Sequence, residues 1–312
     1  MALHLALVAL EIGTGDEVIL PSLAEVHMAH AVSYAGATPV FIDCAPNSLT
    51  LDPAKLQTLI TSRTKAILAP HLYGSPCDMA AIVEIAQRHG VKVIEEASDI
   101  EAGQRNVTDI SLQGDCAIFN FSGNRLINTG EGGMITTNDD DLASRIRLLR
   151  GQGMDLTRRY WFPVVGYNYR MTNIQAAIGL AQLERISERA EARNRVATWY
   201  DDQIVQLGER LTRLPPKSAA RYPSGAYTVR LTDHDANSRD LVIAKLEAGG
   251  IEGARVAPPI HLMPPYAHLK TGALPWTDAV AADGLNLPAH ADLTAADVER
   301  VVATLAEVLA QH

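Results

Sequence analysis

Ionisable and polar residues stand at or just after the ends of several predicted strands, and their types suit acid–base chemistry. Four predicted strands end near positions 21, 70, 96 and 120. In an open sheet of parallel strands, ligands bind outside the carboxyl ends of the strands. The polar residues expected at this edge are Glu25, His27, His71, Glu96, Asp99, Asn120, Ser122 and Arg125.

Three carboxylates and one arginine of this set form the predicted catalytic group, namely Glu25, Glu96, Asp99 and Arg125. When carboxylates lie near one arginine, a like charge raises one pKa and the guanidinium lowers another. Two carboxyl groups with divergent pKa values can act as general acid and general base. A structural alternative stays open, in which Arg125 neutralises Glu96 or Asp99 in a closed site, because structural ion pairs shift pKa values in the same way.

The elements that must position these residues alternate between strand and helix. Apolar runs predict strands at 16–21, 38–43, 65–70 and 91–96, and helical periodicity and helix-end residues predict helices at 3–10, 26–34, 52–60 and 78–89. Such alternation indicates an α/β fold with a mainly parallel sheet and helices on both faces. A long predicted helix from 173 to 207 leads into a smaller C-terminal part, so we predict domains at 1–200 and 201–312.

The composition is that of a globular protein and argues against several classes of protein. The chain has 312 residues, of which 47% are hydrophobic and 20% are charged, and its net charge is −9. This acidic balance does not favour a nucleic-acid surface, and no stretch of about 18 apolar residues predicts a membrane span. Three cysteines at wide spacings predict neither a disulfide framework nor a metal site, and they favour a cytoplasmic protein.

Several longer segments occur in an order that is specific when taken together. They include GDEVILPS (15–22), TKAILAPHLYGSPCDM (64–79), TGEGGMITTND (129–139) and GYNYRMTNIQAAIGLAQLERI (166–186). This ordered set resembles the DegT/DnrJ/EryC1/StrS aminotransferases, which use pyridoxal 5′-phosphate (PLP) to aminate keto-sugars. The resemblance implies a fold-type I architecture with a mainly parallel seven-stranded sheet and a smaller C-terminal α+β domain. It also implies a homodimer with its active sites at the interface, acting on a small-molecule metabolite.

The family's functional positions carry other residues in this chain. Arg125 stands where the family has its Schiff-base lysine, and Glu25 stands where it has a ring-stacking aromatic residue. Glu96 replaces the aspartate that pairs with the pyridine nitrogen. Asp99 replaces a Gln, His or Glu, and Asn120 replaces a phosphate-binding serine. The family's phosphate turn, which precedes the first helix, does not occur, so we expect an N-terminally shortened fold.

The resemblance also assigns two positions outside the first sheet. Asn168, in GYNYRM, matches the family's cross-subunit phosphate ligand, and His261 lies in a loop similar to the substrate-side loops of the family. The predicted substrate-binding residues are therefore His27, His71, Asn120, Ser122, Asn168 and His261. For His71, packing at the end of its strand is the competing interpretation.

Taken together, these departures predict an enzyme that has lost PLP chemistry. A guanidinium has a pKa above about 12 and stays charged, so Arg125 cannot form a Schiff base. We therefore expect no cofactor, and PLP-independent acid–base catalysis in a bacterial biosynthetic pathway. Two alternatives remain open: a non-catalytic homologue that binds a metabolite or an active aminotransferase, and a PLP-dependent sugar aminotransferase.

Overall fold

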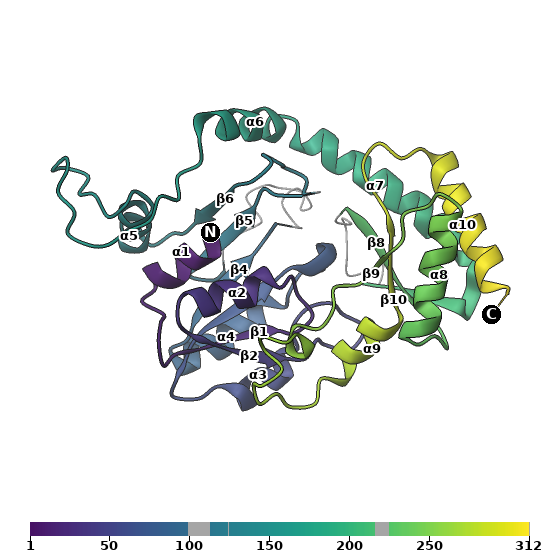
Figure 1. Cartoon of the computed structure of the whole chain (residues 1–312), viewed down its shortest axis with the longest axis horizontal. Coiled ribbons are helices and arrows are strands. Elements are labelled where there is room, and N and C mark those ends of the chain that lie inside the picture. The colour runs from purple at the N-terminus through teal and green to yellow at the C-terminus, as the bar shows by residue number, and fades with distance from the viewer. Residues whose placement is uncertain (99–112, 124, 216–224, 312) are drawn as a thin grey trace.

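Two β-sheets and the helices that pack on them make up the structure, a computed structural model that describes residues 1–98, 113–123, 125–215 and 225–311. The helices α6 (Asn173–Leu183) and α7 (Ile186–Gln203) connect the two parts along the chain. In Figure 1 the first sheet lies to the left of the second, and α6 and α7 run across the top of the view between them.

The first sheet contains the strand ends at which the site was predicted. Its strands are β1 (Glu17–Pro21), β2 (Thr38–Ile42), β3 (Thr64–Pro70), β4 (Lys92–Glu96), β5 (Cys116–Asn120) and β6 (Gly133–Thr136), in the order β2-β1-β3-β4-β5-β6. β6 pairs antiparallel with β5, and the other neighbours pair in parallel. The predicted mainly parallel α/β sheet is confirmed. The described residues supply six strands, so the seventh stays a prediction.

Helices cover both faces of this sheet. They are α1 (Ala2–Ala9), α2 (His27–Tyr34), α3 (Pro53–Leu59), α4 (Met79–His89) and α5 (Asp140–Arg150). Along β1, Val18 and Leu20 share a buried cluster with α1, α2 and α5, whereas Ile19 between them belongs to the cluster of α3 and α4. Successive side chains of a strand point to opposite faces, so unbroken apolarity is what a sheet buried on both sides requires.

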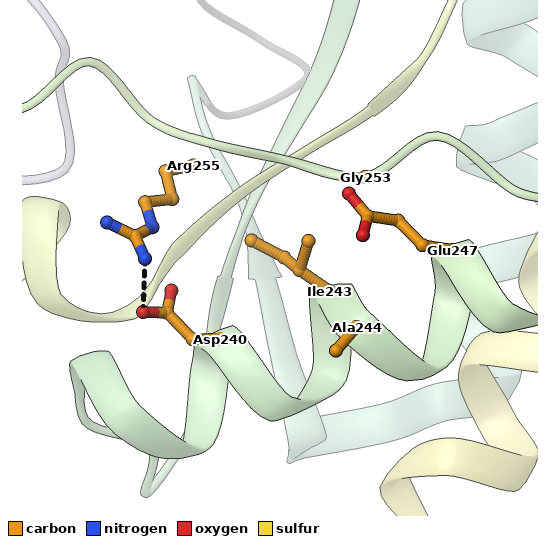
Figure 2. Close-up of a pocket in the computed structure, with 6 residues that line it drawn as sticks. All are labelled: Asp240, Ile243, Ala244, Glu247, Gly253 and Arg255. Atoms are coloured by element: carbon orange, nitrogen blue, oxygen red, sulfur yellow. Dashed lines mark hydrogen bonds and ion pairs between the residues drawn. The ribbon is translucent and has the colours of Figure 1, made fainter.

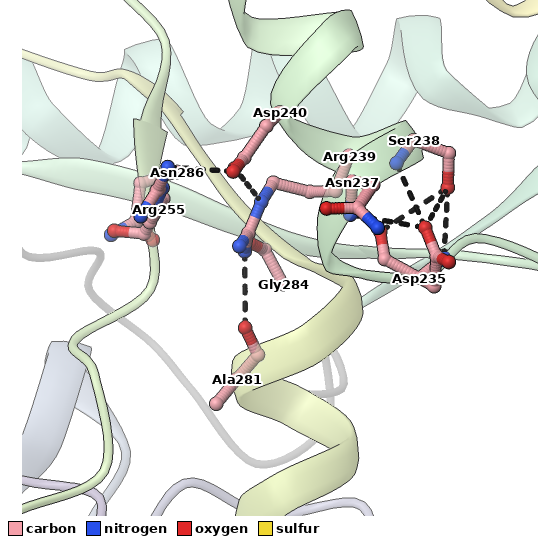
Figure 3. Close-up of polar contacts among 9 residues, drawn as sticks. All are labelled: Asp235, Asn237, Ser238, Arg239, Asp240, Arg255, Ala281, Gly284 and Asn286. Atoms are coloured by element: carbon pink, nitrogen blue, oxygen red, sulfur yellow. Dashed lines mark hydrogen bonds and ion pairs between the residues drawn. The ribbon is translucent and has the colours of Figure 1, made fainter. Parts of the chain in front are cut away.

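The second sheet is antiparallel and smaller. It contains β7 (Leu211–Arg213), β8 (Ala226–Leu231), β9 (Ala254–Arg255) and β10 (Gly284–Pro288), in the order β7-β8-β10-β9. Its core is shared with α7, α8 (Ala236–Ala248) and α10 (Ala295–Leu309). Figure 3 shows the buried Arg239 of α8, whose guanidinium binds Asp240 and donates to the carbonyls of Ala281 and Gly284. This arginine fixes α8 to the end of α9 (Pro275–Asp283).

Asp43 joins the two parts. Its carboxylate has no exposed surface, and it lies 2.8 Å from Nζ of Lys55. It also accepts the backbone N–H groups of Thr277 (2.8 Å) and Trp276 (3.3 Å) in the first turn of α9. N–H groups at the start of a helix lack partners within the helix and attract negative charge. Asp43, just after β2, therefore anchors an element of the C-terminal part to the first sheet.

The long helix predicted from 173 to 207 is in fact two helices. Arg185 leaves helical geometry (φ −112°, ψ 18°) between α6 and α7, and its guanidinium binds Glu188 in the first turn of α7. The predicted domain boundary near residue 200 falls within α7 and stays a prediction. Within the described part of the chain, every helix is too short or too polar to cross a bilayer.

Candidate functional site

Arg125, Glu25 and His27 lie together at the carboxyl edge of the first sheet. Nη2 of Arg125 lies 2.5 Å from Oε1 of Glu25, although the two residues are 100 positions apart in the sequence. The other oxygen of Glu25, Oε2, lies 3.1 Å from Nδ1 of His27. Only 10% of the Arg125 side chain is exposed. The fold thus assembles three of the predicted site residues into one charged cluster.

Glu25 is held in its ionised form by this cluster. Burial alone raises the pKa of a carboxyl group, but the hydrogen bond from His27 and the charge of Arg125 outweigh it, so the pKa of Glu25 is lowered. The predicted effect of an arginine on a neighbouring carboxylate therefore applies to Glu25. Whether this carboxylate acts in catalysis stays a prediction.

A chain of hydrogen bonds joins the ends of β4 and β5. The Ser98 hydroxyl and backbone N–H both donate to Oε1 of Glu96, which is 2% exposed. The backbone N–H of Asn120 donates to Oγ of Ser98 (2.7 Å). Ser122 donates its hydroxyl (2.8 Å) and its N–H (3.0 Å) to Oδ1 of Asn120. The fold therefore fixes a buried carboxyl group beside the turn that leads to Arg125.

Ser98 is a site residue that the sequence analysis missed. It bridges Glu96 and Asn120, and neither partner would be held in the same way without its hydroxyl. A signal was available, because Ser98 follows the strand end by two residues and is polar. Its neighbour Asp99, a predicted catalytic residue, lies outside the described residues.

The glycine-rich corner after Arg125 is tightly packed. Gly132 has φ of +157°, and a Cβ at this position would lie 2.7 Å from Oγ1 of Thr129 and 3.1 Å from the Met171 side chain. The Thr129 hydroxyl donates to the carbonyl of Glu131 across the corner. Only glycine fits such a close approach. The corner therefore fixes the path of the chain between the end of β5 and β6.

Two predicted substrate ligands are engaged in structural contacts. His71 is 2% exposed, its Nδ1 accepts the N–H of Cys77, and its Nε2 lies 3.4 Å from Glu95. His261 contacts Ser22 through Nδ1 (2.7 Å) and donates its backbone N–H to the same hydroxyl. These contacts agree with the packing interpretation of His71. The substrate-binding roles of both histidines stay predictions.

Asn168 lies beside the end of α5. It forms an isolated antiparallel bridge with Gly151, the residue that follows α5, and it is exposed. Its predicted role is to reach across a subunit interface, which one chain cannot display. That role stays a prediction.

A cavity of about 380 Å³ lies in the C-terminal part. Figure 2 shows that α8 supplies Asp240, Ile243, Ala244 and Glu247 to its lining and that Gly253 and Arg255 complete it. An ion pair of 2.6 Å joins Asp240 and Arg255 within it. None of the predicted site residues lines this cavity, so the strand ends of the first sheet remain the candidate site. Among the described residues, no group of three or more His, Cys, Asp and Glu side chains could hold a metal ion.

Comparison with known proteins settles the family. The model of the DegT/DnrJ/EryC1/StrS aminotransferase family matches residues 1–306. The chain belongs to this family. It is 57% identical over 309 residues to the GDP-perosamine synthase of Caulobacter vibrioides, a match that covers 99% of this chain and 83% of the relative.

Solved structures of aminotransferases have the same fold as this chain. DesV of S. venezuelae, solved in complex with a ketimine intermediate, is 33% identical with a TM-score of 0.88, and the match covers 99% of this chain and 82% of DesV. NtdA of Bacillus subtilis, solved with the cofactor PMP (pyridoxamine 5′-phosphate) bound, is 27% identical with a TM-score of 0.88, covering 99% of this chain and 71% of NtdA.

These likenesses overturn the predicted loss of PLP chemistry. The predictions of PLP-independent acid–base catalysis and of no cofactor are wrong, because the relatives are sugar aminotransferases and a solved relative carries PMP. The error has a physical origin. Arg125 excludes a covalent bond between this side chain and the cofactor, but it does not exclude the cofactor itself.

The described residues fit such a cofactor when it is held without a covalent bond. Glu96 supplies a buried carboxyl group at the end of β4, where the sequence resemblance predicts the partner of the ring nitrogen. The glycine-rich corner and the turn held by Asn120 keep the surrounding backbone in place. Arg125, committed to Glu25, offers no amine for attachment.

Proposed function

We propose that the chain is a PLP-dependent aminotransferase acting on a keto-sugar that is linked to a nucleotide. The observation that carries this proposal is the 57% identity, over 99% of the chain, to a GDP-perosamine synthase. That name denotes an amino sugar carried on GDP. We therefore assign a GDP-linked keto-sugar as the substrate class and bacterial sugar biosynthesis as the setting. When bound, the cofactor supplies the amino group that replaces the ketone oxygen.

In this proposal, Glu96 and His27 are the residues of the chain that take part in the reaction. The carboxylate of Glu96 favours the protonated form of a ring nitrogen placed against it. His27 lies with its Nδ1 3.1 Å from Oε2 of Glu25, and its Nε2 is the ring atom that we assign to proton exchange with the substrate. Glu25 acts by orienting this ring and by balancing the charge of Arg125.

The three cysteines support a reducing compartment. Cys44, Cys77 and Cys116 are buried, and their thiols are free. Burial raises the pKa of Cys44 and of Cys116 to about 12, so both thiols stay protonated and unreactive. We therefore propose the cytoplasm as the location.

An uncovered apolar surface supports a homodimer. No residue of α6 is buried, although most of its sequence is apolar. The exposed large apolar side chains on this helix and on the preceding loop are Leu156, Tyr160, Trp161, Phe162, Val164, Val165, Ile174, Ile178, Leu180 and Leu183. An apolar helix left in water is unfavourable, and such surfaces mark sites of association. We propose that a second copy of the chain covers this surface.

Ile174→Asp is expected to weaken the dimer. Ile174 is 76% exposed in the single chain and lies in the first turn of α6, where an aspartate favours the helix. A carboxylate at a dry interface raises the dissociation constant of the dimer on the order of 100-fold. Sedimentation velocity over a concentration series measures this shift. The matched control is Val205→Asp, 74% exposed and outside the surface; an equal shift in both variants would contradict the assignment.

The proposed function is tested by mixing the purified chain with PMP and a GDP-linked keto-sugar. Mass spectrometry is expected to detect the corresponding GDP-linked amino sugar, in an amount limited by the PMP supplied. A UDP-linked keto-sugar is expected to react more slowly. If the chain neither binds these ligands nor forms the amino sugar, the proposal is wrong.

A further inference from the structure

The residue at position 125 sets how this chain can hold its cofactor. Arg125 lies at the carboxyl edge of the sheet, mostly buried, with its guanidinium 2.5 Å from the carboxylate of Glu25. The lowered pKa of Glu25 keeps this pair charged, and His27 completes the cluster on the other carboxylate oxygen. The arginine is therefore an ordered part of the site.

Arginine cannot replace lysine as the point of attachment. To form an imine, a side chain must present a neutral primary amine to the aldehyde carbon, and one water is released. A guanidinium keeps its proton at any pH the protein meets. Its pairing with Glu25 stabilises the charged form further. No bond between position 125 and the cofactor aldehyde can form.

Four of the other described lysines either lie at the opposite edge of the sheet or are held in other contacts. Lys65 and Lys92 lie at the amino ends of β3 and β4, the edge of the sheet opposite to Arg125. Lys55 lies 2.8 Å from Asp43, and Lys245 donates to Gln311 on α10's C-terminal side. The amines of Lys55, Lys92 and Lys245 are therefore engaged in structural contacts, that of Lys92 with Asp115.

We propose that this chain holds its pyridoxal-type cofactor as a dissociable ligand, without a covalent bond to any of its lysines. The inference rests on the proposed function, since it concerns the cofactor of that same reaction. In this proposal, Arg125 provides a fixed positive charge at the edge of the sheet, and Glu25 holds that charge in place. A cofactor held in this way would exchange with the solvent between turnovers, as a co-substrate does.

Reductive trapping tests the inference. The chain is incubated with PLP and treated with sodium borohydride, which delivers hydride to the imine carbon while water protonates the nitrogen, so that any imine becomes a permanent amine. Peptide mass spectrometry then maps the label on Lys55, Lys65, Lys92, Lys217, Lys245 and Lys270. We expect no stoichiometric label on wild-type chain, and saturable binding of PMP that is lost on dialysis.

Two variants complete the test. Arg125→Lys is expected to gain stoichiometric label at position 125, whereas Arg185→Lys, an exposed arginine paired with Glu188, is expected to gain none. Stoichiometric label on a wild-type lysine would overturn the inference while leaving the aminotransferase proposal intact. An Arg125→Lys chain that folds, as judged by circular dichroism, yet gains no label would also overturn it. Absence of both PMP binding and GDP-sugar binding in calorimetry would overturn the proposed function as well.

Discussion

Arg125→Lys is expected to raise the rate of amino-sugar formation on the order of 100-fold. A lysine amine can lose its proton and so move protons during the reaction, which a guanidinium cannot do. General acid–base groups contribute about 10²- to 10⁴-fold to a rate, and we expect the lower end because Glu25 remains beside the new amine and favours its charged form.

The rate is measured by mass spectrometry of the nucleotide sugar at saturating PMP. Arg185→Lys is the control, because its side chain lies on the surface and pairs with Glu188. It is expected to leave the rate unchanged. An Arg125→Lys variant with wild-type rate and wild-type secondary structure would show that position 125 does not limit the chemistry.

Asp43→Ala is expected to lower the free energy of unfolding by about 3–5 kcal/mol. The substitution removes the acceptor of the buried Thr277 N–H and of the Trp276 N–H, and it also removes the partner of Lys55. Lys55 is partly exposed and can turn to water, so most of the loss comes from the unpaired N–H groups at the start of α9. Urea unfolding followed by circular dichroism measures the difference. Asp202→Ala, on the exposed side of α7, is expected to change stability by less than about 0.5 kcal/mol.

The contribution of Asp43 should disappear in acid. Burial raises the pKa of this carboxyl group, but its hydrogen bonds from Lys55 and from the start of α9 outweigh burial and lower the pKa below its ordinary 3.8. A group with a lowered pKa in the folded state stabilises the fold above its unfolded pKa and loses this effect as the pH falls through the folded value. The gap between wild type and Asp43→Ala should therefore be full above pH 3.8 and shrink below it. A gap that does not change with pH would contradict this role.

The sheet and the residues at its edge could be predicted from the sequence because they depend on local pattern. Unbroken apolar strands separated by amphipathic helices specify a covered parallel sheet, and the polar residues after each strand must then lie at one edge. This reasoning places Glu25, His27 and Arg125 at the same edge. In the structure Glu25 contacts both of the others. The particular pairing of Arg125 with Glu25 depends on loop geometry between strands that are distant in the sequence, which no local pattern encodes.

The cofactor prediction failed for a different reason. The five departures from the family pattern, with Arg125 as the central one, predict a single correlated loss of PLP chemistry. The chemistry of a guanidinium forbids only the covalent bond. The fold depends on the whole chain, and the fold is what this chain shares with the aminotransferase relatives.

The central claim is that this chain transfers an amino group to a nucleotide-linked keto-sugar although position 125 holds an arginine. The most direct measurement uses PMP labelled with ¹⁵N in its amino group, wild-type chain and a GDP-linked keto-sugar, with the products analysed by mass spectrometry. We expect a GDP-linked amino sugar that carries the label. A chain that binds PMP and the GDP-linked keto-sugar but transfers no ¹⁵N to the sugar would contradict it.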